Sequence, residues 1–367
     1  MKYLDEYRDS RLAENLLREI ERAVTQHWVL MEICGGQTHT IMRYGLDELL
    51  PKKIELVHGP GCPVCVTPAS VLDRAIELAQ REEVTLVSYG DLLRVPGTKM
   101  DLLSARARGA DVRMVYSPLD ALRIARTNPE RKVVFLAVGF ETTAPANAMA
   151  VYQAHREGLR NFFLLSSHVL VPPAIRALTA SPENRVQGFI APGHVCTVVG
   201  CEDYERLVEE LHMPIVVGGF EPVDLLQAIH TLVVKLESGR PEFANEYKRS
   251  VSRHGNPAAQ RIVEEVFEVA DQSWRGLGEI PRSGLKLRAK YAPWDADKVF
   301  ELDVVKAEAP SVCISAEILR GRKKPTDCTA FGITCTPESP IGAPMVASEG
   351  ACAAYYQYRR HNLVSIQ

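Results

Sequence analysis

The chain has 367 residues, of which 46% are hydrophobic and 24% are charged, and its formal net charge is -3. These values are typical of a globular protein with two or three domains, each able to bury its own core. A net charge this small gives no electrostatic reason to expect nucleic acid or an anionic membrane surface as a partner. The charged N-terminus lacks the apolar segment of a signal peptide, and no apolar run approaches the roughly 18 residues of a membrane span. We therefore expect a cytoplasmic protein.

Residues 10–26 have the periodicity of an amphipathic helix. After it, short β-branched or apolar runs alternate with helical patterns. The expected strands are residues 28–33, 54–58, 84–89, 112–116, 133–138, 162–166, 188–191 and 215–217. The expected helices between them include residues 68–80, 117–127, 146–157, 172–180 and 203–211. Such alternation predicts parallel sheets with helices on both faces, and hence the α/β fold class.

Two topologies fit eight such strands. One is a single (β/α)8 barrel; the other is a pair of doubly wound domains divided at the turn-forming residues 127–131. We favour the two doubly wound parallel-sheet domains, followed by a smaller, loop-rich, helical C-terminal domain. The expected boundaries are 1–26 for an N-terminal helix that packs on the C-terminal domain, 27–130 and 131–240 for the two α/β domains, and 241–367 for the C-terminal domain.

Nine cysteines need an explanation, because structural disulfides are rare in a reducing cytoplasm, where metal binding or thiol chemistry more often accounts for cysteines. Within the strand and helix pattern lie Cys34, Cys62 and Cys65. Beyond the end of that pattern lie Cys313, Cys328, Cys335 and Cys352. Cys196 and Cys201 match no generic motif, and we expect them to be structural.

Four unusual motifs each follow an expected strand. CGGQTH (34–39) follows the first, GPGCPVC (59–65) the second, GFE (139–141) the fifth and PGHVC (192–196) the seventh. Glycine lets the backbone turn sharply, and the carboxyl ends of parallel strands form the crevice in which ligands bind. We therefore expect all four motifs to converge at one sheet edge, where a nearby helix N-terminus would lower the pKa of Cys34.

Each of these residues also has a simpler interpretation. The C-x-x-C pair has the spacing of a dithiol-disulfide switch or of half a zinc site. Glu141 could be only an acid in the first turn of a helix. His39 and His194 could be ordinary loop histidines.

The C-terminal cysteines have the spacing C-x14-C-x6-C-x16-C. Structural zinc sites usually contain ligand pairs separated by two to four residues, and this set has none. Four thiolates that converge from turn-rich loops suit an iron-sulfur cluster, so we expect the C-terminal domain to be an iron-sulfur domain.

Taken together, these motifs resemble those of the HypD family of hydrogenase maturation proteins, in order from about residue 30 to residue 355. The resemblance implies two α/β domains and a C-terminal domain whose four cysteines hold a [4Fe-4S] cluster. It implies a scaffold for building the Fe(CN)2CO group of [NiFe] hydrogenases. The implied partners are a HypC-type chaperone and a HypE-type cyanide donor, with no nucleic acid and no membrane.

The resemblance also implies residue roles. Cys34 is the expected ligand of the Fe(CN)2CO iron, and the dithiol of Cys62 and Cys65 is expected to pass on electrons from the cluster. His39 and Glu141 are expected to handle protons or to orient ligands. The candidate catalytic residues are therefore Cys34, His39, Cys62, Cys65, Glu141 and His194.

Two other functional classes stay open at this point. An iron-sulfur thiol-redox enzyme acting on a small substrate would use the same cysteines, although they lack the C-x3-C-x2-C spacing of radical SAM enzymes. A zinc-stabilised interaction scaffold would use the cysteines structurally.

Overall fold

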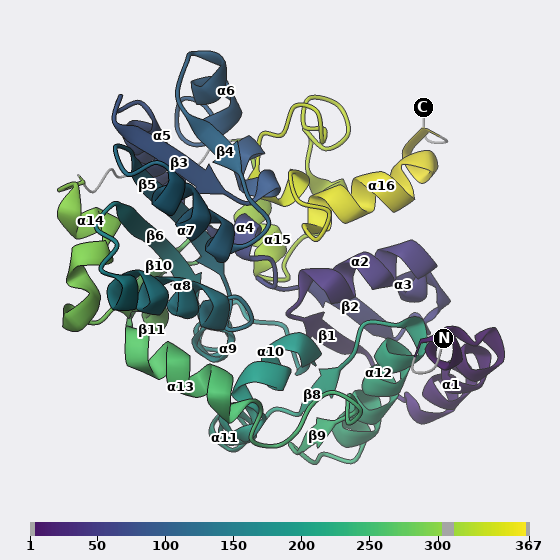
Figure 1. The fold of residues 1–367 in the computed structure, drawn as a ribbon. Helices are drawn as coiled ribbons and strands as arrows, with labels where there is room; N and C mark the ends of the chain where they lie inside the picture. The colour runs from purple at the N-terminus through teal and green to yellow at the C-terminus, as the bar shows by residue number, and fades with distance from the viewer. Residues whose placement is uncertain (1–3, 303–311, 365–367) are drawn as a thin grey trace.

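The computed structural model describes residues 4–302 and 312–364, with side chains as far as residue 359 (Figure 1). Within these residues the strands form two separate sheets. Sheet A has the order β2-β1-β7-β8-β9, and sheet B has the order β10-β11-β6-β5-β3-β4. Two sheets exclude the single barrel, and the α/β fold class with two sheets made mainly of parallel strands is confirmed.

All eight expected strands are present, with ends that differ from the expected ones by no more than three residues. Sheet A contains β1 (Trp28–Glu32), β2 (Ile54–His58), β7 (Gly188–Pro192), β8 (Ile215–Gly218) and β9 (Phe243–Asn245). Sheet B contains β3 (Val84–Ser88), β4 (Val112–Met114), β5 (Lys132–Gly139), β6 (Phe162–Val169), β10 (Phe267–Trp274) and β11 (Gly278–Leu287).

Helices connect and cover these strands. The helices of the first half are α1 (Ser10–Ala23), α2 (Gly35–Tyr44), α3 (Leu46–Leu49), α4 (Pro63–Val66), α5 (Ala69–Ala79), α6 (Leu102–Ala107), α7 (Pro118–Thr127), α8 (Ala144–Glu157) and α9 (Val171–Thr179). Those of the second half are α10 (Gly193–Val199), α11 (Glu202–Leu211), α12 (Pro222–Glu237), α13 (Pro257–Val266), α14 (Ala296–Val299), α15 (Ser315–Leu319) and α16 (Ala351–Val364). The 3-10 helices are η1 (Asp5–Arg8), η2 (Gly90–Arg94), η3 (Ala289–Trp294), η4 (Pro325–Asp327) and η5 (Ala343–Met345).

The sheets do not follow the expected division into residues 27–130 and 131–240. Sheet A pairs β1 with β7 in parallel, so it joins the start of the chain to residues 188–245, and β3 to β6 form sheet B from the segment between. The boundary at residue 130 is therefore wrong for the sheets. The reason is physical: an apolar run shows that a strand is buried, but it does not show which strand it pairs with.

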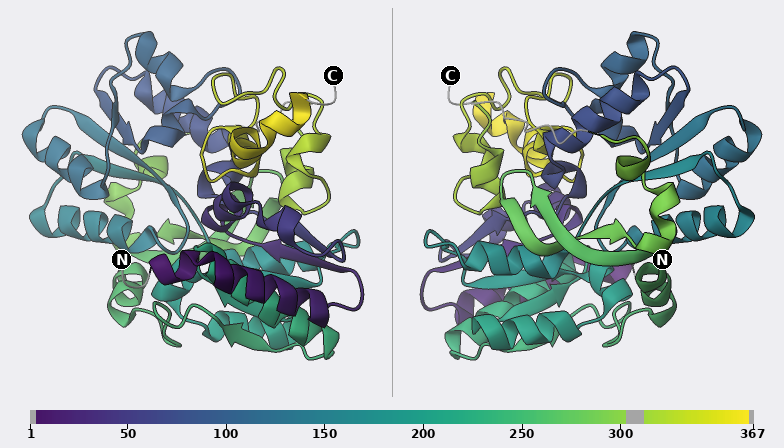
Figure 2. Two further views of the ribbon diagram at one scale, coloured as in Figure 1. Left: turned by 90° about the vertical axis from the view of Figure 1, so that its right-hand side faces the viewer. Right: turned by 90° about the vertical axis from the view of Figure 1, so that its left-hand side faces the viewer.

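Residues 243–287 also differ from the expected C-terminal domain. Strand β9 joins sheet A, and the antiparallel hairpin β10–β11 extends sheet B beside β6. Figure 2 shows this hairpin as a long curved ribbon in green. After β11 the described residues contain no further named strand: η3 and α14 follow the hairpin, and from residue 312 onward α15, η4 and η5 lead to α16.

The N-terminal helix packs on α12 rather than on the C-terminal region, as Figure 1 shows. The side chain of Glu237, at the end of α12, fixes the link between α1 and β1. Its carboxylate accepts hydrogen bonds from the backbone N–H and hydroxyl of Thr25 and from the indole N–H of Trp28. The expected packing of residues 1–26 on the C-terminal domain is therefore wrong.

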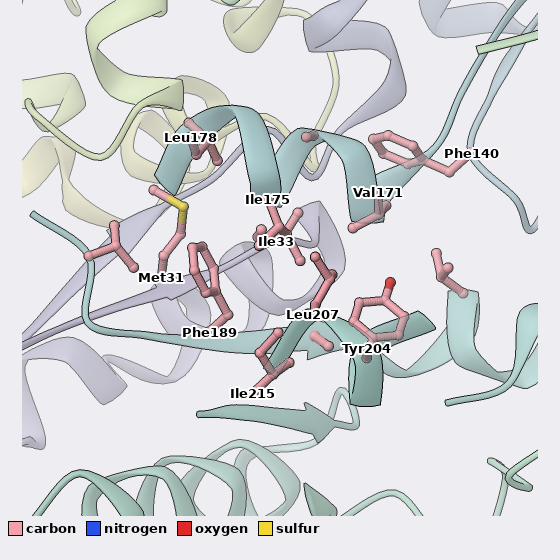
Figure 3. Close-up of a cluster of buried hydrophobic side chains, with 14 of the residues drawn as sticks. Met31, Ile33, Phe140, Val171, Ile175, Leu178, Phe189, Tyr204, Leu207 and Ile215 are labelled. Atoms are coloured by element: carbon pink, nitrogen blue, oxygen red, sulfur yellow. The ribbon is translucent and has the colours of Figure 1, made fainter. Parts of the chain in front are cut away.

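The two sheets share a buried core (Figure 3). Met31 and Phe189 of sheet A belong to the same buried cluster as Ile175 of α9 and Phe140, which follows β5 of sheet B. Strands β1 and β7 thus share a core with residues of sheet B. Within the described ranges, no helix is long and apolar enough to cross a membrane.

Candidate functional site

Strands β1 and β7 lie side by side in sheet A, and the chain leaves them toward opposite edges of the sheet. This is the topological switch point at which doubly wound sheets bind ligands. Cys34 follows β1 and His194 follows β7. The sulfur of Cys34 lies 3.5 Å from Nδ1 of His194, so the fold brings together two residues that are 160 positions apart.

Cys34 is the residue that precedes α2, and it is 2% exposed. Burial raises the pKa of its thiol well above the ordinary value, although the backbone N–H groups of Gln37 and Gly36 act in the opposite direction. The expectation that the helix N-terminus lowers this pKa is therefore wrong, because desolvation outweighs the helix. A metal ion bound to the sulfur would reverse the balance, since coordination deprotonates a thiol.

His194 is the second residue of α10, and its ring packs against Phe220 with a centroid distance of 5.2 Å. Burial lowers the pKa of His194 to about 4, so the imidazole is neutral at pH 7. In the tautomer with a bare Nδ1, this nitrogen accepts a hydrogen bond from the Cys34 thiol and orients the sulfur.

The GPGC loop touches the Cys34 segment directly. The N–H of Gly35 donates to the carbonyl of Gly61 at 2.9 Å. A Cβ at Gly61 would lie 2.1 Å from the nitrogen of Cys34, so only glycine fits at this point. This contact sets Cys62 and Cys65 beside the Cys34 site.

Cys62 and Cys65 form a disulfide with a Cα–Cα distance of 5.2 Å. Both are buried, and they pack against Val64 and against Ala347 from the C-terminal region. Helix α4, which contains Cys65, also contacts η5. The disulfide therefore lies between the Cys34 segment and the C-terminal region.

His39 lies on α2, but the contacts that the structure describes for it run to the C-terminal region. Its Nδ1 is 3.3 Å from the carbonyl oxygen of Ser348, and its Nε2 is 3.1 Å from the hydroxyl of Tyr358 on α16. No described hydrogen bond joins it to Cys34. His39 therefore ties α2 to the C-terminal region.

Glu141 does not join this group, because it follows β5 of sheet B whereas the other three motifs follow strands of sheet A. Its Oε1 accepts a hydrogen bond of 2.9 Å from the N–H of Val171, so it caps α9. It lines a separate pocket of about 700 Å³ with Pro172 and Asp203. The expected convergence of all four motifs at one sheet edge is wrong for Glu141.

Cys196 lies near Glu141, and Cys201 lies near Cys196. Burial raises the pKa of Cys196 well above its ordinary value, as do the charges of Cys201 and Glu141. Burial raises the pKa of Cys201 to about 11. Neither has a described contact with Cys34.

The four C-terminal cysteines line one pocket, together with apolar residues that include Ile318, Phe331 and Met345. Burial raises the pKa of Cys352, and so do the neighbouring thiols of Cys313, Cys335 and Cys328. In the described part of the chain, no group of three or more His, Cys, Asp or Glu side chains is arranged to hold a single metal ion. Four thiols that line one pocket are the number and type of donors that a [4Fe-4S] cluster uses.

Two further residues at the Cys34 site were not predicted. Gln37 is fully buried and donates from Nε2 to the carbonyls of Ala191 and Gly218, while its Oε1 has no partner among the described residues. Glu349 lies against Gly35, and its charge contributes to the raised pKa of Cys34. Gln37 stands inside the CGGQTH motif, whereas Glu349 lies in a turn-rich segment with no pattern that could have revealed it.

Fold and site together define an α/β protein with a thiol site at a switch point, a neighbouring cysteine pair and a C-terminal four-cysteine pocket. The HypD family model, described as "Hydrogenase formation hypA family", matches residues 11–359. The chain therefore belongs to the HypD family.

Curated relatives agree over nearly the full length. The chain is 50% identical to the hydrogenase maturation factor HypD of Rhizobium leguminosarum bv. viciae, with 98% of this chain and 96% of the relative covered. It is 49% identical to HypD2 of Bradyrhizobium diazoefficiens, with 98% and 97% covered. It is 44% identical to HypD of Escherichia coli K12, with 98% and 99% covered.

Proposed function

We propose that this protein is a cytoplasmic maturation scaffold on which the Fe(CN)2CO group of a [NiFe] hydrogenase is built, with a HypC-type chaperone and a HypE-type cyanide donor as partners. One observation carries the proposal. The Cys62–Cys65 disulfide lies between the Cys34 segment and the C-terminal region that contains four cysteines. This arrangement connects a candidate iron ligand, a redox pair and a candidate cluster.

Cys34 is the proposed protein ligand of the iron, which is cargo rather than a resident cofactor. A thiolate is a soft donor and suits low-spin iron that carries CN and CO. Cys34 is almost completely buried, and its sulfur lies close to two backbone N–H groups and to Nδ1 of His194. These groups orient the sulfur and limit the access of water.

Cyanide release from a thiocyanate-like carrier consumes two electrons, because cleavage of the S–CN bond leaves a thiolate and cyanide. A dithiol of Cys62 and Cys65 can supply both electrons and becomes the disulfide that the structure shows, with release of two protons. Reduction of this disulfide by an external electron donor of low potential restores the dithiol.

Cys313, Cys328, Cys335 and Cys352 are the proposed ligands of a [4Fe-4S] cluster. When bound, such a cluster supplies single electrons. The chain itself brings its C-terminal region to the disulfide through the contact of Ala347 with Cys62 and Cys65. His39 helps to hold this region against α2.

The iron assignment is tested by Cys34→Ala, expressed with its HypC-type partner and purified without oxygen. We expect the copurified iron that carries infrared bands of bound CN and CO to fall at least about tenfold, since removing a ligand should cost no less than removing a group that supports one. Cys201→Ala, a buried cysteine away from the site, is the matched control and should retain the bands. Undiminished bands in Cys34→Ala would show that another residue holds the iron. If the wild-type protein also lacked them, the iron-sulfur thiol-redox enzyme would be favoured instead.

A further inference from the structure

Glu32 is a fully buried carboxylate at the end of β1, two residues before Cys34. Its Oε1 accepts a hydrogen bond of 2.6 Å from the hydroxyl of Thr38 on α2. Its Oε2 lies 3.5 Å from the backbone nitrogen of Cys34. A buried carboxylate is costly unless several donors satisfy it, so these contacts fix the segment around Cys34 from within.

His58, at the end of β2, extends these contacts toward the C-terminus. Its Nδ1 is 2.5 Å from Oε1 of Glu32, and its Nε2 is 3.1 Å from the hydroxyl of Tyr355. The rings of His58 and Tyr355 meet edge to face at 5.3 Å. In one consistent arrangement, the hydroxyl of Tyr355 donates to Nε2 of His58, and the Nδ1–H of His58 donates to the carboxylate of Glu32. Both ring nitrogens of His58 then have a hydrogen-bond partner.

Tyr355 lies on α16, one turn after Cys352. The three side chains therefore form a buried chain of hydrogen bonds from the helix of the C-terminal cysteine pocket to the backbone of Cys34. None of the three residues belongs to the predicted candidate site.

We infer that Glu32 is a positioning residue, and that the chain Tyr355–His58–Glu32 makes the position of Cys34 depend on the position of α16. This inference goes beyond the proposed function, because it concerns how the thiol is held and not which ligand it binds. Movement or loosening of the C-terminal region would thereby alter the geometry at Cys34.

The test uses the full-length protein without iron cargo and the variant Tyr355→Phe, which removes one hydroxyl and keeps the ring. The readout is the rate at which iodoacetamide alkylates Cys34, followed by mass spectrometry and divided by the rate at Cys201. We expect this ratio to rise roughly two- to tenfold, the range that corresponds to one hydrogen bond. A variant that only destabilised the whole fold would accelerate the alkylation of both cysteines and leave the ratio of the two rates unchanged.

Tyr291→Phe is the matched control, because Tyr291 is also buried and its hydroxyl donates to a carboxylate, Glu265, far from the site. It should not change the ratio. Glu32→Gln should raise the ratio, and adding Tyr355→Phe to it should produce little further change, since both act through one chain.

An unchanged ratio in Tyr355→Phe, or fully additive effects in the double variant, would overturn the inference. Because no iron cargo is present, this result does not depend on whether Cys34 is an iron ligand.

Discussion

Glu141 illustrates how one buried residue can carry a pH dependence. Burial raises its pKa from 4.5 to about 7, and the charge of Asp203 acts in the same direction, while the N–H of Val171 opposes it. The folded chain therefore binds this proton more tightly than the unfolded chain does. The contribution to stability is fully present below about pH 4.5, and it is lost as the pH rises through about 7.

Glu141→Gln should remove this dependence and keep the cap on α9, because the amide oxygen can still accept from Val171. Between about pH 5 and about pH 8, we expect the variant to gain up to about 3 kcal/mol in the free energy of unfolding relative to the wild type. Urea unfolding of both proteins across this range measures the difference. His168 and His194 affect the free energy of unfolding in the opposite direction, because burial lowers their pKa values to about 4. Both proteins contain these histidines, so their effect cancels in the difference.

The control for this experiment is Glu209→Gln, which changes an exposed glutamate on α11. This variant measures the effect of removing a carboxyl group that is exposed to solvent. If the free energies of unfolding of Glu141→Gln and the wild type differed by the same amount at every pH, the pKa of Glu141 would not be raised in the folded chain.

At the scale of elements, the contact between the loop after β1 and the loop after β2 sets the geometry of the thiol site. Gly61→Ala places a Cβ where the backbone of Cys34 now lies, so one of the two loops must move. We expect a loss of about 1–3 kcal/mol in the free energy of unfolding, as for other overpacked sites. Cys34 should also become more accessible to alkylation, measured against Cys201.

Gly158→Ala is a suitable comparison for this loop contact. Gly158 has a φ of +66°, and no atom lies within 4 Å of the point that a Cβ would occupy, so alanine there meets strain but no clash. The expected cost is about 1 kcal/mol, without a change at Cys34. Equal alkylation of Cys34 in the two variants would mean that the Gly61 contact does not position the thiol.

At the scale of the whole molecule, the strands could be located well from the sequence because all of the eight except β4 are short runs of mostly buried residues. The pairing of β1 with β7 could not be predicted, since pairing between distant segments leaves no local pattern in the sequence. The hairpin β10–β11 was not predicted, although β10 alternates partly buried and exposed residues and a turn with Gly276 follows it. Cys34 and His194 could be placed because loops after parallel strands meet at a switch point. The contacts of His39 could not be predicted, because they come from Ser348 and from Tyr358 of α16, more than 300 residues away.

Glu32 and His58 could have been noticed from the sequence. Each is the last, titratable residue of a strand that is mostly apolar, and a titratable residue that becomes buried needs a partner. The sequence does not show that Glu32 and His58 are partners of each other, or that His58 also contacts Tyr355.

The C-terminal cysteines give the last prediction, because a cluster would also hold together a region with little core of its own. Cys328→Ala removes one of the four proposed ligands. We expect loss of the visible absorbance of the cluster and of most bound iron and acid-labile sulfide, while Cys201→Ala retains them. Metal binding of this kind contributes directly to folding. Trypsin should therefore cleave faster within residues 320–324 of the anaerobically purified variant, where arginines and lysines follow α15.

Full iron and sulfide content in Cys328→Ala would exclude this residue as a ligand, and zinc in place of iron in the wild type would identify a structural metal site instead. Unchanged proteolysis with the cluster lost would show that α16 and its packing on α2 hold the region without the metal.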